Sequence, residues 1–514
     1  MEAQRTKIGY LVGGGLKENF RVRLTVSSQE IQEGAFVIIA SGDWRYYGIV
    51  TDIQLGATDP RFADEQMEGR FPSYISNALH GQTLYANLEV LPNLMLEIGP
   101  ELGTPAYKDW QGKIDVGLKG PPRILPVKNV PPHHAQVFLA DEGDVAEIFG
   151  KEEKGYFEIG ETREQGYPVR LDLTRFIQRS AGIFGSSGSG KSFLARVLLA
   201  GLVKDSQVSL LVFDMHNEYA YTYTPPESDK PAIGLKDKLG DKIHVVGLGR
   251  GADAMYQGRQ PSINLEILMS DILPEDIELL SSELTLRETT SSTLAALVRS
   301  FGIKNWLSEF KNLQSMPKRK DDEGNSYYPE GSIERWAEEN AIHPEAAKTL
   351  HSRLQKIFDR PYVVESSATN GIRTIIDYLS NGRNVVLSFG KYEYDLDYLL
   401  VSNVLTRHIR REWEHRTNEY RKDTQAIQRP RPLMIVVEEA HKLLNKEMAV
   451  QTIFSTIARE LRKYYVTLLI IDQRPSQIFD DVLSQLGTRI SGWLGDEDDI
   501  NAVMSGLSNK DKGS

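Results

Sequence analysis

The stretch GIFGSSGSGKSFLARVL, residues 182–198, decides how the whole chain is interpreted. Within it, residues 185–192 match G-x-x-x-x-G-K-[ST], after a strand-like segment and before a helical one. Glycines let the backbone curl so that successive N–H groups face a phosphate, and the helix N-terminus adds partial positive charge. Lys191 can reach the outer phosphates, and the Ser192 hydroxyl can ligate Mg²⁺. The residues predicted to bind ATP are Gly185, Ser187, Gly188, Ser189, Gly190, Lys191, Ser192 and Phe193.

Strand-like and helical segments alternate from about residue 166 onward. The apolar runs AGIFG, VSLLVFD, KIHVVGL, NVVLSFG, PLMIVVEE and VTLLIID are typical of parallel strands covered by helices on both faces. Periodic apolar positions between roughly 265 and 360 predict a helical insertion. We therefore predict an α/β fold, a RecA-like P-loop ATPase core over 166–514 with a parallel-rich sheet.

A pair of carboxylates ends one of these strands. In PLMIVVEEAHKLL, which begins at Pro432, the apolar run stops at Glu438 and Glu439. Beside a phosphate loop, the first carboxylate suits a place near Mg²⁺ and the second can polarise the attacking water. We assign Glu438 to the metal and Glu439 to the water. The alternative is a strand that runs into an acidic helix start, which the helix dipole also favours.

Two further strand ends carry polar residues. The strand VTLLIID is followed by Gln473, and VSLLVFD ends at Asp214, with His216 and Glu218 beyond it. The carboxyl ends of parallel strands meet at the ligand crevice of such a sheet. We therefore expect Gln473 to contact the γ-phosphate or the water, and Asp214 to lie near the metal or the water.

Arginines precede the strand VTLLIID. A predicted helix in FSTIARELRKYY carries Arg459 and Arg462. Near a subunit boundary, Arg462 could neutralise transition-state charge on a neighbour's ATP. From spacing alone, a solvated surface charge is the favoured interpretation.

The first 165 residues have a different pattern, with short β-rich runs such as AFVIIAS and YYGIVTDI separated by turn residues. This pattern predicts a small β-barrel over 1–165. The chain has 514 residues, a formal net charge of -11 and no cysteine, so disulfides and thiolate metal sites are excluded. No signal-peptide core and no apolar run of about 18 residues is present, so we expect a cytoplasmic protein that does not act at a membrane unless a partner brings it there.

Together these motifs resemble the HerA family of FtsK/HerA-type hexameric ATPases, over nearly the whole chain. RSAGIFGSSGSGKS is similar to the family's phosphate loop, FDMHNEY to its D-x-H-x-E-Y element, and IVVEEAH to its Walker B strand. ARELRKYYVTLLIIDQRPSQ is similar to its arginine-finger helix and glutamine sensor. Two positions depart from the family pattern, Leu461 for a usual glycine and Ser180 for a frequent histidine.

The resemblance implies a homo-hexameric ring that translocates double-stranded DNA. It implies Lys191 and Ser192 on ATP and Mg²⁺, Glu438 and Glu439 as the Walker B pair, and Gln473 as the sensor. Arg462 would be the trans-acting finger, and Arg179 a second intersubunit arginine. The implied partner is a NurA-like nuclease in DNA repair, or an antiviral defence effector such as a sirtuin-like NAD-consuming enzyme or another nuclease.

Two other functions stay open. In the first, an ATP-dependent scaffold ring assembles and activates a partner enzyme without translocation, which the net charge of -11 favours slightly. In the second, the chain is a small-molecule kinase, which leaves the barrel and the arginine helix without a purpose.

Overall fold

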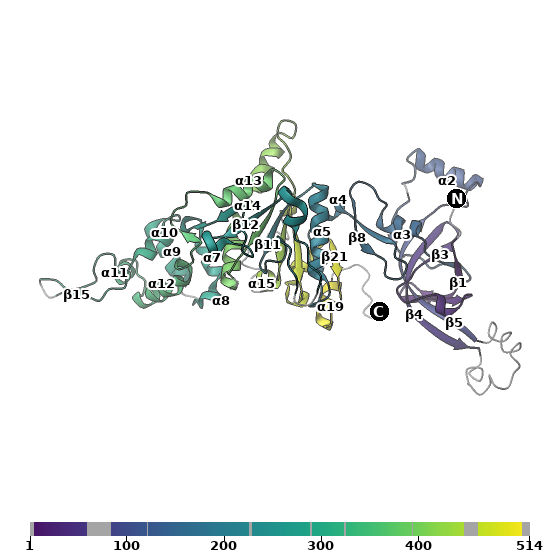
Figure 1. Ribbon diagram of the computed structural model, residues 1–514, viewed down its shortest axis with the longest axis horizontal. Helices are drawn as coiled ribbons and strands as arrows, with labels where there is room; N and C mark the ends of the chain where they lie inside the picture. The colour runs from purple at the N-terminus through teal and green to yellow at the C-terminus, as the bar shows by residue number, and fades with distance from the viewer. Residues whose placement is uncertain are drawn as a thin grey trace. The chain divides into compact units, whose positions relative to one another are not determined.

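The computed structural model describes residues 5–58, 84–120, 122–225, 229–287, 290–322, 325–392, 394–446 and 461–505. These residues form two compact units, one ending at Asp172 and the other beginning at Leu173. The division falls after the expected boundary at 165/166 because an antiparallel hairpin crosses that point. The hairpin pairs β8 (Tyr156–Glu161) with β9 (Pro168–Asp172), so it stays in one unit (Figure 1).

The first unit is the predicted small barrel. Its strands follow the order β2-β1-β7-β3-β4-β5, and pairing of β5 with β2 closes the sheet. Alternate residues of β2, such as Phe20 and Val22, point into a core that is closed to solvent. The strands are β1 (Lys7–Gly15), β2 (Glu18–Leu24), β3 (Phe36–Ser41), β4 (Trp44–Ala57), β5 (Leu84–Glu97), β6 (Ile124–Pro126) and β7 (Gln136–Leu139).

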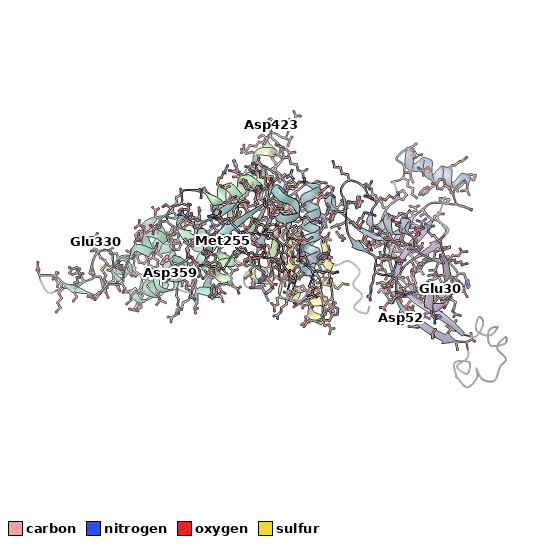
Figure 2. The ribbon with its side chains drawn as sticks, in the orientation of Figure 1. Glu30, Asp52, Met255, Glu330, Asp359 and Asp423 are labelled. Carbon is pink, nitrogen blue, oxygen red and sulfur yellow. The ribbon has the colours of Figure 1, made fainter. Side chains whose placement is uncertain are left out.

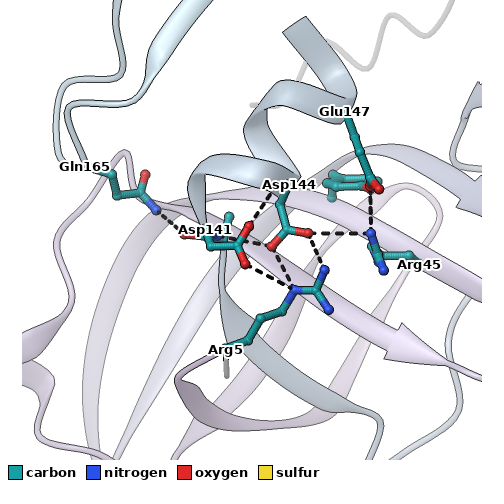
Figure 3. A network of polar contacts seen from close by, with 8 residues as sticks. Arg5, Arg45, Asp141, Asp144, Glu147 and Gln165 are labelled. Carbon is teal, nitrogen blue, oxygen red and sulfur yellow. Dashed lines mark hydrogen bonds and ion pairs between the residues drawn. The ribbon is translucent and has the colours of Figure 1, made fainter. Parts of the chain in front are cut away.

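Two helices accompany the barrel, α2 (Pro105–Asp115) and α3 (Glu142–Phe149). Helix α3 begins at a capping box in which Asp141 and Asp144 each accept a backbone N–H of the other. Asp144 is buried and also accepts from Arg5 at 2.6 Å, as Figure 3 shows. Arg45 lies 3.5 Å from the same carboxylate and 2.6 Å from Glu147. These ion pairs fasten the helix to the barrel strands.

The second unit contains the predicted parallel sheet. Its strand order is β13-β12-β18-β11-β19-β20-β10-β21, and every neighbouring pair is parallel. The central strands are buried along their whole length, which agrees with helices on both faces. The strands are β10 (Ala181–Phe184), β11 (Ser209–Asp214), β12 (Ile243–Leu248), β13 (Ile263–Leu265), β18 (Asn384–Ser388), β19 (Leu433–Glu438), β20 (Val466–Asp472) and β21 (Thr488–Ser491).

Helices cover this sheet and extend beyond it. The longest is α14 (Asp395–Lys422), and Asp423, the residue that follows it, is labelled in Figure 2 at the tip of a projection. The other helices of the unit near the sheet are α4 (Leu173–Phe176), α5 (Lys191–Asp205), α6 (Leu235–Leu239), α13 (Gly371–Ser380), α15 (His441–Leu444), α18 (Asp480–Ser484) and α19 (Glu497–Met504).

A helical segment separates β13 from α13 in the chain. Its core includes the fully buried Trp306 and Phe310, and it packs in one cluster with the core of the sheet. Its elements are β14 (Ile267–Leu268), α7 (Pro274–Leu279), α8 (Ser281–Leu284), α9 (Thr290–Phe301), α10 (Trp306–Asn312), β15 (Arg319–Lys320), β16 (Ser326–Tyr327), α11 (Ile333–Glu339), α12 (Pro344–Phe358) and β17 (Val363–Val364). None of the described helices combines the length and apolar character needed to cross a bilayer.

Candidate active site

The glycine-rich loop connects β10 to α5, so it lies at the carboxyl edge of the sheet. Gly190 caps α5 with a φ of 84°, a left-handed conformation that side chains other than glycine adopt only at a cost. A Cβ on Gly185 would lie 2.4 Å from the Ser189 hydroxyl oxygen, so this close approach also needs glycine. The loop therefore has the curled backbone that a phosphate cradle requires.

The loop is tied to the strands on both sides of β10. The Gly185 N–H donates to the carbonyl of Asp472 at 3.3 Å, and the Ser186 N–H donates to that of Trp493 at 2.9 Å. The buried Ser189 hydroxyl has no hydrogen-bond partner in the described part of the chain. Of the other predicted binding residues, Lys191 and Ser192 are half-buried, whereas the exposed ones are Ser187, Gly188, Gly190 and Phe193.

Lys191 faces a group of carboxylates. Burial lowers the pKa of Lys191 from its ordinary value, and the negative charges of Glu439, Asp472 and Glu438 oppose that shift. Glu438 ends β19 and Glu439 follows it, whereas Asp472 ends β20. In the sheet, β20 lies between β19 and β10. The strand order therefore brings the predicted acid pair to the phosphate loop.

Glu438 is buried at the end of β19. Its Oε2 atom has no hydrogen-bond partner among the described residues. Burial raises the pKa of Glu438 well above its ordinary value, and repulsion from Asp214 adds to the shift. A buried, unpartnered carboxylate oxygen fits a nearby cation or its water ligands.

Glu439 is held from two sides. Its φ of 45° is left-handed, a conformation that non-glycine residues adopt mainly at constrained sites. The side-chain amide of Gln473 donates to its Oε1 at 3.1 Å, and Nδ1 of His441 lies 3.6 Å from its Oε2. The predicted residues Glu439 and Gln473 therefore lie together.

Two residues of this cluster had no role in the sequence prediction, His441 and Asp472. Asp472 is fully buried, accepts the backbone N–H of His441 at 2.7 Å and contacts the ring Nδ1 at 3.0 Å. This hydrogen bond raises the pKa of His441. Their positions could have indicated a role, because His441 follows the acid pair closely and Asp472 is the last residue of β20.

Asp214 ends β11 but uses both oxygens within the protein. Oδ1 accepts the N–H of Glu218 at 2.8 Å, and Oδ2 accepts the N–H of Tyr219 at 3.0 Å and the hydroxyl of Tyr256 at 2.6 Å. Burial raises the pKa of Asp214. The residue thus supports the loop after β11, and its charge also acts on Glu438, the residue assigned to the metal. Glu218 on that loop adds a further negative charge that acts on Lys191.

The predicted arginines lie at the opposite edge of the sheet. Arg179 precedes β10, and Arg462 lies on a 3-10 turn before β20, and both are exposed. The four residues of β10 separate Arg179 from the loop by about 13 Å, and β20 is longer still. Neither arginine therefore lies beside the phosphate loop of its own chain. Arg459 falls outside the described residues.

The residues near the phosphate loop can hold Mg²⁺ together with water molecules and phosphate oxygens. No group of three or more metal-ligating acids and histidines forms a ready metal site within the described ranges. Mg²⁺ at nucleotide sites keeps several waters and uses phosphate oxygens, so one hydroxyl and one carboxylate suffice. Ser192 and the unpartnered oxygen of Glu438 would supply them.

Comparison with known proteins gives a consistent set of relatives. Residues 157–409 match the family model of the helicase HerA central domain. The DNA double-strand break repair helicase HerA of Sulfurisphaera tokodaii is 24% identical over 493 residues, which cover 94% of this chain and 82% of the relative. That of Saccharolobus solfataricus is 23% identical over 503 residues, with 94% and 81% covered.

Solved structures give more distant matches. VirB4 of Thermoanaerobacter pseudethanolicus has a TM-score of 0.39 at 16% identity, covering 70% of this chain and 90% of that one. The bacterial conjugative coupling protein TrwB has a TM-score of 0.37 at 12% identity, covering 67% and 71%. Scores this low transfer no residue role.

Proposed function

The chain belongs to the HerA family of P-loop ATPases, and on that premise we propose that it is a hexameric motor that hydrolyses ATP to move along double-stranded DNA. Its relatives are named as DNA double-strand break repair helicases. The observation that carries the proposal is the arrangement around Glu439, which lies against Gln473 and beside the phosphate loop.

Each residue has a defined part in hydrolysis. The loop N–H groups and the Lys191 ammonium bind the outer phosphates of ATP. Bound Mg²⁺ would neutralise phosphate charge, held by Ser192 and reached by Glu438 through water. Glu439 accepts a hydrogen bond from the attacking water and polarises it. Gln473 fixes the Glu439 carboxylate and can orient the same water.

A second copy of the chain completes the site. Arg179 and Arg462 lie at the amino edge of the sheet, away from their own phosphate loop. In a ring, that edge can face the nucleotide of a neighbour, where an arginine neutralises charge in the transition state. The barrel unit offers a place for a partner, a NurA-like nuclease or a defence effector.

The deciding experiment is steady-state ATP hydrolysis at a fixed moderate salt concentration, with and without linear duplex DNA. Salt must be fixed because phosphate contacts weaken steeply as it rises. We expect DNA to stimulate hydrolysis and the Glu439→Gln variant to show neither basal nor stimulated turnover. Hydrolysis that is indifferent to DNA at every salt concentration at which DNA binds would contradict translocation.

A scaffold ring is the second candidate, and the net charge of -11 favours it because a strongly acidic chain is a poor general binder of DNA. In that case ATP binding alone would assemble and activate a partner enzyme. The Glu439→Gln variant separates the two functions. Partner activity that survives in this variant supports the scaffold, and activity lost despite intact assembly supports the motor.

A further inference from the structure

An exposed tryptophan lies directly beside the phosphate loop. Trp493 follows β21, and its carbonyl accepts the Ser186 N–H at 2.9 Å. The preceding Gly492 donates its N–H to the carbonyl of Phe184, also at the foot of the loop, at 2.8 Å. A Cβ on Gly492 would lie 3.2 Å from the side chain of Ser189, so the two segments touch. The backbone at Trp493 is therefore fixed relative to the cradle.

The indole ring is supported on one side and open on the other. A Cβ on Gly495 would lie 2.7 Å from the ring atom Cη2, so the ring rests against this glycine. The next residue, Leu494, packs against the core of the unit and anchors the segment. Trp493 nevertheless keeps 72% of its surface exposed. Because this exposed aromatic face lies at a fixed position beside the phosphate loop, it can receive the flat face of a bound molecule.

The position of Trp493 matches one end of a nucleotide. The acid pair and Gln473 lie on the β20 side of β10, so the γ-phosphate end of ATP points to that side. The phosphates occupy the loop at the end of β10. The nucleoside end then extends to the other side of β10, where β21 and Trp493 lie.

We propose that Trp493 is the platform on which the nucleobase of the bound nucleotide stacks. The inference rests on the nucleotide site of the proposed function and adds the residue that binds the base. Every nucleobase has a π-face, so a stacking platform binds purine nucleotides with little discrimination between adenine and guanine.

Equilibrium binding to the full chain tests this proposal. The Glu439→Gln substitution is present in every protein so that bound ATP persists, and no DNA is added. We expect Trp493→Ala to raise the Kd for ATP and for ADP by about tenfold to a hundredfold, as loss of one base–aromatic stack implies. Trp493→Phe should recover most of this loss. Inorganic triphosphate, which lacks a base, should bind both proteins equally, and Tyr327→Ala controls for loss of an exposed aromatic elsewhere.

Tryptophan fluorescence gives an independent readout. Trp306, Trp413 and Trp336 are buried, and the remaining two, Trp44 and Trp110, are only half-exposed. Acrylamide quenching should therefore report mainly on Trp493. ATP, but not inorganic triphosphate, should reduce the quenching, and Trp493→Phe should abolish the difference.

Three results would overturn the proposal. The first is a Kd for ATP in Trp493→Ala within about twofold of that in the parent protein. The second is an equal loss of triphosphate affinity, which would mean that the loop itself was disturbed. The third is a changed oligomeric state with an unchanged Kd, which would assign Trp493 to a contact between copies. Because these measurements contain no DNA, a failure of DNA-stimulated hydrolysis leaves them interpretable.

Discussion

Glu439 shows how single side chains define the chemistry of this site. Its backbone is left-handed, its carboxylate accepts from Gln473, and His441 lies on its other side. His441 is itself held by the buried Asp472. The group proposed to polarise the attacking water is thus held in place by its protein neighbours, an arrangement that lowers the cost of reaching the transition state.

Lys191→Ala should abolish measurable ATP hydrolysis and weaken ATP binding at least tenfold. The outer phosphates lose their point counter-charge, and the nearby carboxylates then repel them. Titration of each protein with ATP, with circular dichroism to verify folding, measures the effect. If the folded variant bound ATP with wild-type affinity, Lys191 would not be a phosphate-binding residue.

His441→Gln should destabilise the protein more at pH 6 than at pH 9. The hydrogen bond to Asp472 raises the pKa of His441, so its stabilisation is complete below the ordinary value of about 6.5 and is lost as pH rises through the raised value. A charge-assisted hydrogen bond contributes about 1.5–3 kcal/mol at the acidic end. Urea unfolding of both proteins at the two pH values measures the difference. A pH-independent difference would mean that His441 stays neutral.

At the scale of elements, buried acids hold two segments in place. The Asp214 carboxylate accepts two backbone N–H groups of the loop after β11. The Asp144 carboxylate accepts the backbone N–H of Asp141, the residue that caps α3, and a guanidinium N–H of Arg5. Each carboxylate satisfies donors that would otherwise be buried without partners, which is costly. Both residues therefore stabilise the fold directly, and we expect them to affect ATP hydrolysis only through the segments that they hold in place.

Asp214→Asn should lower the free energy of unfolding by about 1–3 kcal/mol, because an amide N–H₂ would face a backbone N–H in place of an oxygen. Turnover should fall as well, since the loop carries Glu218 near Lys191. Denaturant unfolding and ATPase assays measure the two effects. Asp241→Asn, at a fully exposed carboxylate, serves as the control and should change stability by less than about 0.5 kcal/mol.

Asp144→Ala should destabilise the barrel unit by about 3–5 kcal/mol, because Arg5 and Arg45 lose their buried counter-charge and α3 loses its capping box. The exposed Glu142→Ala on the same turn is the matched control. Fluorescence of Trp44 and Trp110 during unfolding follows this unit. Equal midpoints in the two variants would show that the network is dispensable.

At the scale of the whole molecule, the proposed hydrolysis requires a second copy of the chain. The residues proposed to bind ATP and to polarise the attacking water lie on the carboxyl edge of the sheet, while the exposed arginines lie on the amino edge. An arginine that serves catalysis from there must reach another copy. Oligomerisation is therefore part of the proposed chemistry.

Arg462→Ala should spare ATP binding and reduce turnover by about 10³-fold or more. Mixing this variant with Lys191→Ala should restore part of the activity, because an intact loop of one copy then meets an intact arginine of another. Hydrolysis is followed across mixing ratios, and Arg179→Ala is treated in the same way. Absence of any recovery, in mixtures that do assemble together, would count against a shared site.

The sequence by itself determined the local parts of this protein. The glycine loop, the apolar strands and the alternating barrel strands were predictable because each depends on backbone conformation or on a burial period within a few residues. The place of the acid pair at a strand end was predictable because the apolar run of β19 stops there. The placement of β20 between β10 and β19 was not predictable in this way, since strand order depends on contacts between segments far apart in the chain.

Only the tertiary structure decided which polar residues share a site. Strand order sets Gln473 against Glu439 and Asp472 against His441, although more than thirty residues separate each pair. The tertiary structure also makes Asp214 accept hydrogen bonds from the loop after β11, and it brings Trp493 beside the phosphate cradle. It also leaves Arg179 and Arg462 at the far edge. The sequence shows a residue's type and whether it lies at the end of a strand. Its contacts depend on which strands are neighbours, and strand order depends on how the whole sheet is buried.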